Sequence, residues 1–177
     1  MIHLSALELL RQHAPLPFGW DEVVVGYDFG ILSIREIQDW LRTVGPLGLE
    51  GQRTANLEGP ELLSFEASLW AACSEALGIR EPRPGLTRWA RAQDLWRTAL
   101  LKEALAWPLE SADFAEAIET IRDRVGCPED MHGLVKTGCA WAGTVASVER
   151  SAVVTFVEKL EHRLLPQDGD WLSLAAS

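Results

Sequence analysis

A helix start signal ahead of an apolar run with helical spacing is the feature that most constrains this chain. Ser33 and Glu36 have the S-x-x-E spacing of a capping box, in which the hydroxyl and the carboxylate bond two amide groups left free at a helix start. Ser5 and Glu8 repeat this spacing near the N-terminus. The two signals predict helices that begin at these points. After the second signal the apolar residues recur every three or four positions, at Ile34, Ile37, Leu41 and Val44.

The same kind of spacing predicts helices along most of the remaining chain. The first helix ends before Pro15, and further helices cover residues 60–78, 87–107, 111–125 and 147–165. Residues 20–30 hold three valines, which favour a strand, and two acids, which suit a helix start, and we predict a short helix there. Residues 47–60 are rich in glycine and have no apolar periodicity, so we predict a surface loop.

Three of the predicted helices have an apolar face that is expected to pack into the core. In residues 60–78 this face comprises Leu62, Leu69, Cys73 and Leu77. In residues 111–125, with Ser111 as the predicted cap, it comprises Phe114, Ile118, Ile121 and Val125. In residues 147–165 it comprises Val148, Ala152, Phe156, Leu160 and Leu164.

The helix over residues 87–107 carries Trp89, Trp96 and Trp107 within a narrow arc, which predicts that it is the central and most buried helix. The fold class expected is therefore all-α, as a compact bundle of about seven or eight helices around this tryptophan-rich helix. We find no internal repeat or linker and predict one domain over residues 1–177. Residues 166–177 form a tail, in which Trp171 and Leu172 are candidates to dock on the domain.

The charge and the termini limit the classes of partner. The formal net charge of −10 argues against a nucleic-acid-binding protein, because such binding needs Lys and Arg against the phosphates. The N-terminal residues lack a basic leader, and no run approaches the roughly 20 apolar residues that span a bilayer. We predict a cytoplasmic protein without membrane association, in which the three cysteines are free thiols. The sequence does not indicate an oligomeric state.

No catalytic signature is recognised in the chain. Cys127, His132 and Cys139 are soft metal ligands, but a structural zinc site needs four ligands and no fourth is evident. His13 and His162 fall near helix C-termini, where a cation suits the helix dipole, so a structural role is favoured over nucleophilic catalysis. We therefore predict a chain that is not an enzyme and has no metal or cofactor.

Acidic residues follow one side of the predicted helix over residues 111–125, opposite its apolar face. This acidic ridge comprises Asp113, Glu116, Glu119 and Asp123. Its spacing suits a basic partner, although a charged face opposite a core face is also what an ordinary solvated helix shows.

Residues 80–97 form an arginine segment with five arginines and two acids. Arg80, Arg83, Arg88 and Arg91 are the candidates for an anion-binding site, which would suit an unrecognised enzyme. The alternative is an ordinary exposed helix start. The tryptophans of the segment fall on the predicted buried face, which removes them as stacking platforms for bases.

The order of several segments resembles a bacterial all-helical family known only as a domain of unknown function. The resemblance is carried by RWARAQDLWRTALLKEAL from Arg88, IETIRDRVGCPEDMHGLVK from Ile118 and the closing LEHRLLP. The opening FGWDEVVVGYDFGILSIREI is also similar to the start of that family, and so is the turn from Gly126 to Asp130.

The resemblance implies an all-helical cytosolic bacterial protein and suggests one of the immunity type that accompanies polymorphic toxins. An acidic domain without a catalytic set suits a binding protein that covers the active site of a basic toxin domain, where opposite charge speeds encounter. A housekeeping interaction module and an unrecognised enzyme are the alternatives.

Overall fold

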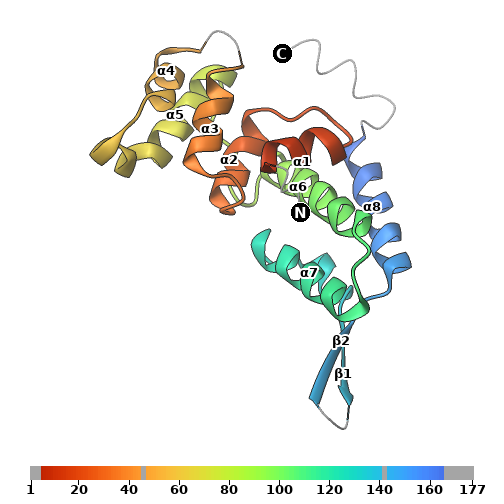
Figure 1. The fold of residues 1–177 in the computed structure, drawn as a ribbon. Helices are drawn as coiled ribbons and strands as arrows, with labels where there is room; N and C mark the ends of the chain where they lie inside the picture. The colour runs from red at the N-terminus through yellow and green to blue at the C-terminus, as the bar shows by residue number, and fades with distance from the viewer. Residues whose placement is uncertain (1–4, 45–46, 141–142, 166–177) are drawn as a thin grey trace. The chain divides into compact units, whose positions relative to one another are not determined.

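A computed structural model describes residues 5–44, 47–140 and 143–165, and within these ranges it contains eight α-helices and one two-stranded sheet (Figure 1). The predicted all-α fold class is confirmed. The predicted tail at 166–177 lies outside the described residues. The helices are α1 Ala6–His13, α2 Trp20–Asp28, α3 Ile34–Leu41, α4 Leu49–Ala55, α5 Phe65–Leu77, α6 Thr87–Ala106, α7 Ser111–Arg124 and α8 Arg150–Leu164. In these described ranges no helix is long and apolar enough to cross a membrane.

The contacts divide the chain into two compact units, and the boundary falls inside α6 between Gln93 and Asp94. Unit 1 contains α2 to α5, most of α1 and the first turns of α6. Unit 2 contains the rest of α6, α7, the sheet and α8. The single domain expected from the sequence stays a prediction.

The capping boxes in unit 1 are confirmed at both predicted sites. At the start of α3 the amide of Ser33 donates to Glu36 Oε2 at 2.9 Å, and the amide of Glu36 donates to Ser33 Oγ at 3.3 Å. Ser5 and Glu8 make the same reciprocal pair before α1. The helix α3 ends at Leu41, so Val44 lies beyond it and is 40% exposed.

The segment of residues 20–30, which the sequence left between strand and helix, forms α2. The amide of Gly19 donates to Glu22 Oε2 at 2.7 Å, which satisfies a free donor at the helix start. The three valines at 23–25 are fully buried in unit 1. The predicted short helix is confirmed, because burial of these side chains overrides the β preference of valine.

The surface loop predicted for residues 47–60 is wrong, because this range contains α4 and the beginning of a 3₁₀ turn, Gly59–Ser64. The amides of Leu49 and Glu50 donate to the two carboxylate oxygens of Glu75 on α5, at 3.0 and 2.8 Å. A carboxylate at a helix N-terminus stabilises it, and this one comes from 25 residues away. Gly48 leaves room for that carboxylate, since a Cβ there would overlap it.

The helix α5 ends as predicted and buries part of the predicted face, since Leu69 and Cys73 are fully buried. Gly78 closes it in the left-handed conformation, with φ of 65°. Leu77, which the predicted face included, is 40% exposed, whereas Ser68, which it did not include, is buried. The buried set is Phe65, Ser68, Leu69, Ala72 and Cys73.

In unit 2, α6 is buried on all sides over five consecutive residues, from Leu95 to Ala99. Trp96 is fully buried in this stretch, as predicted, while Trp107 at the end of the helix is 36% exposed. The helix α7 buries its predicted apolar face, Phe114, Ile118, Ile121 and Val125. Its N-cap residue is Glu110, so the predicted cap at Ser111 is wrong by one residue.

Arg150 at the start of α8 contacts the end of α6, the residues that follow it and α7. Its guanidinium donates to the carbonyl oxygens of Leu105, Trp107 and Leu109 at 3.2, 2.9 and 3.1 Å. It also lies 4.3 Å from the ring centroid of Phe114 on α7. A cation at these carbonyls satisfies acceptors that the end of α6 leaves free.

A hairpin that the sequence did not predict precedes α8. Strands β1, Lys136–Ala140, and β2, Gly143–Ser147, pair antiparallel, with Gly138 opposite Val145. The strand β2 also contacts α7. The glycine-rich composition of these residues hid the strand pattern.

The helix α8 buries only part of the predicted face: Leu160 and Leu164 are buried as predicted, and so is Val148 just before the helix. The buried residues are Val153, Val157, Leu160 and Leu164. Ala152 is exposed and Phe156 only half-buried, so their predicted place in the core is wrong. An interval of four residues exceeds one helical turn by about 40°, so a series spaced four apart drifts away from the core.

Replacing Trp96 by alanine is expected to lower the free energy of unfolding by about 3 to 5 kcal/mol, because it leaves a large cavity in unit 2. Leu63→Ala is the control, since that side chain is 94% exposed, and it should change stability by no more than about 0.5 kcal/mol. Denaturant unfolding measures both. Equal, small changes would contradict the burial of Trp96.

Candidate functional site

The structure places all four acids of the ridge on α7. Asp113, Glu116 and Asp123 are exposed, and Glu119 is half-buried. Arg122 forms ion pairs with Glu119 and, at 3.0 Å, with Asp123. Asp113 and Glu116 have no ion pair within the described part of the chain. The first half of the ridge is therefore unpaired, and the second half is partly neutralised by Arg122.

The arginine segment has two arginines whose charge is already balanced in unit 1. Arg83 pairs with Glu81. Arg88 forms a two-bond pair with Asp21, and its Nη1 donates to the carbonyl of Arg80 at 2.5 Å. The side chains of Arg80 and Arg91 are exposed. The anion site stays a prediction, and these bonds give Arg83 and Arg88 a structural role.

The structure describes the side chains of two of the three candidate metal ligands, Cys127 and His132. Among the residues that the structure describes, no group of three or more His, Cys, Asp or Glu could hold a metal ion. Cys127 and His132 are exposed, and the Cys139 side chain lies outside the described part.

The two cysteines with described side chains differ strongly. Cys73 is fully buried in unit 1, and burial, together with the nearby negative charge of Asp21, raises the pKa of its thiol to about 12. Cys127 is exposed, and its backbone has a positive φ of 51°. Its Sγ lies 3.6 Å from Asp123 Oδ1. Cys73 is thus a core residue without nucleophilic character at neutral pH.

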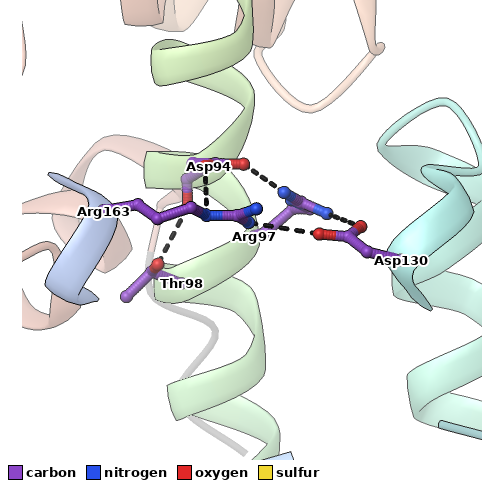
Figure 2. Close-up of polar contacts among 5 residues, drawn as sticks. All are labelled: Asp94, Arg97, Thr98, Asp130 and Arg163. Atoms are coloured by element: carbon purple, nitrogen blue, oxygen red, sulfur yellow. Dashed lines mark hydrogen bonds and ion pairs between the residues drawn. The ribbon is translucent and has the colours of Figure 1, made fainter. Parts of the chain in front are cut away.

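Unit 2 contains an ion-pair ring that the sequence analysis missed, formed by Asp94, Arg97, Asp130 and Arg163 (Figure 2). Arg97 Nη1 is 2.5 Å from Asp130 Oδ1, and its Nη2 pairs with Asp94. Arg163 closes the ring, with Nε 3.3 Å from Asp94 Oδ2 and Nη2 3.1 Å from Asp130 Oδ2. Each arginine contacts both aspartates, so the four formal charges cancel.

Arg97 is the buried member of the ring, with 4% of its side chain exposed. A buried guanidinium is unfavourable unless carboxylates compensate it, and Asp94 and Asp130 do so. The Cζ atom of Arg97 also lies over the side chain of Phe156, 5.7 Å from the centroid of its phenyl ring. Sequence reasoning assigned the arginines of this segment to the surface. The missed signal is an arginine inside the apolar run of residues 95–101, three residues after Asp94.

The ring also changes the acid strength of Asp130. Burial alone would raise the pKa of this carboxyl group, but the hydrogen bonds and charges of Arg97 and Arg163 outweigh burial and lower the pKa below its usual value. Because the pKa of Asp130 is lower in the folded state than in the unfolded chain, ionised Asp130 stabilises unit 2 at pH values above its unfolded-state pKa. This contribution is lost as the pH falls through the folded-state pKa.

Beside the ring lies a groove along α8, the α8 groove, which has two adjoining hollows. One of about 490 Å³ is lined by Asp130, Phe156, Lys159, His162 and Arg163. The other, of about 370 Å³, is lined by Leu134, Glu149, Ser151, Ala152, Thr155, Phe156 and Lys159. Phe156 and Lys159 line both hollows, so the two lie next to each other along α8. The groove exists because α8 buries its other face and leaves Phe156 at the edge of the core.

No family model, curated protein or solved structure matches this chain. The resemblance to the bacterial all-helical family therefore stays a prediction.

Labelling with iodoacetamide is expected to modify Cys127 in the folded protein and to spare Cys73. The reason is that Cys127 is exposed, whereas Cys73 is buried with a pKa of about 12. Peptide mapping by mass spectrometry distinguishes the sites, and a sample unfolded in denaturant, in which both react, is the control. Rapid labelling of Cys73 under native conditions would contradict its place in the core.

Proposed function

We propose that this chain is a non-enzymatic binding domain for a basic protein partner, and that it acts as an immunity-type protein that covers a basic toxin domain. One observation carries the proposal: a chain of net charge −10 exposes Asp113 and Glu116 on one helix face. Neither acid has an ion pair within the described residues, so a partner's cations meet no competing arginine there.

Charge arranged in this way favours fast and selective association. A surface of one sign attracts a partner of the opposite sign before contact and raises the association rate. Glu119 and Asp123 extend the ridge, but Arg122 must be displaced before they can bind a partner. We therefore assign the main electrostatic contribution to Asp113 and Glu116.

The test is a capture experiment with the purified protein as bait in an extract of its source cells. The expected result is retention of a basic protein, and retention that weakens above about 0.1 M salt, where the Debye length is about 10 Å. Charge reversal by Asp113→Lys with Glu116→Lys should abolish it. The fold should survive, because exposed substitutions change stability by about 0.5 kcal/mol or less.

Glu58→Lys with Glu61→Lys is the matched control. Both residues are exposed in unit 1, and the double variant changes the net charge by the same amount. Retention by this control and loss with the ridge variant supports the proposal. Equal retention by both variants, or recovery of no basic protein, would contradict it. Inhibition of the captured protein's toxicity separates an immunity protein from a housekeeping interaction module.

A further inference from the structure

The larger hollow of the α8 groove combines cationic donors with an aromatic side chain in an otherwise acidic chain. Its volume of about 490 Å³ falls within the range of small-molecule sites, roughly 300–1,000 Å³. Lys159 and His162 line it and have no ion pair within the described residues, while Arg163 completes the basic side. Among the residues that the structure describes, the one acid in its lining is Asp130, which already pairs with Arg97 and Arg163.

The charges of the ion-pair ring cancel, so Lys159 leaves this hollow with a net positive charge. The acid in the adjoining hollow, Glu149, precedes α8. Ten residues separate it from Lys159, which corresponds to about 15 Å along a helix. The end of the groove at residues 159–163 is therefore the end that attracts an anion.

Arg163 brings hydrogen-bond donors that are already oriented. Its Nε and Nη2 contact Asp94 and Asp130, which holds the guanidinium in place. A guanidinium has five N–H donors, so Nη1 still has both of its own for a ligand. Because the ring fixes its direction, less side-chain entropy is lost on binding than for a free arginine.

We propose that the α8 groove binds a small organic phosphate, a phosphate monoester with an aromatic group. The Lys159 ammonium, a His162 ring N–H and the Arg163 Nη1 group donate to the terminal phosphate oxygens. The aromatic group packs against Phe156, which is half-buried and lines both hollows. Three donor side chains match the three terminal oxygens of a phosphate monoester, whereas a carboxylate has two oxygens.

Phenyl phosphate is the probe, titrated into ¹⁵N-labelled full-length protein up to about 10 mM, which detects affinities near 1 mM. We expect saturable shifts at residues 156–163. Lys159→Ala should weaken binding about tenfold, because a hydrogen bond to a charged group is removed. Arg35→Ala is the control, since this exposed arginine in unit 1 removes the same charge and should leave affinity within about twofold.

The variant Phe156→Leu distinguishes the contribution of the aromatic group to binding from that of the phosphate. It should weaken binding of phenyl phosphate more than binding of inorganic phosphate, because only the ester has an aromatic group to lose its contact. The absence of saturable shifts would overturn the proposal, and so would equal effects of Lys159→Ala and Arg35→Ala. Inorganic phosphate binding as tightly as phenyl phosphate would overturn the assignment of an organic ligand. None of these results depends on the acidic ridge or on a protein partner.

Discussion

The burial of the Arg97 guanidinium is the constraint on which unit 2 most depends. A charge with 4% of its side chain exposed requires nearby carboxylates, and they come from α6 itself and from the turn after α7. Asp130, in that turn, and Arg163, on α8, are thereby held at fixed distances from α6. Lys102 on α6 adds an ion pair with Glu161 on α8.

The same requirement connects stability with the binding surfaces of unit 2. Arg163 pairs with both aspartates of the ring and also lines the α8 groove. Arg150 has a comparable role at the other end of α8, where it satisfies carbonyls after α6 and lies over Phe114. Arg150 thus connects the helix that carries the acidic ridge to α8 and to the end of α6, while Asp113 and Glu116 stay in solvent.

Local signals in the sequence predicted the elements whose stabilising contacts are also local. The helix α3 begins at a capping box made by residues three apart, and α7 buries the four apolar residues that its spacing indicates. The helix α4 could not be predicted in this way, because its N-terminal amides are capped by Glu75 from another helix. The acidic ridge was located from spacing, but its partial neutralisation by Arg122 and the ion-pair ring both depend on side-chain placement. The groove was missed because a series spaced four apart placed Phe156 in the core.

A double-mutant cycle of Arg97→Met and Asp130→Asn tests the central claim, that the ring stabilises unit 2 by compensating the buried Arg97. Arg97→Met should lower the free energy of unfolding at neutral pH by about 3 kcal/mol or more, since it leaves two carboxylates with Arg163 alone. Asp130→Asn should cost less in the Arg97→Met background than in the wild type, with a coupling of about 0.5 to 3 kcal/mol. Costs that add without coupling, or an Arg97→Met variant as stable as the wild type, would contradict the account.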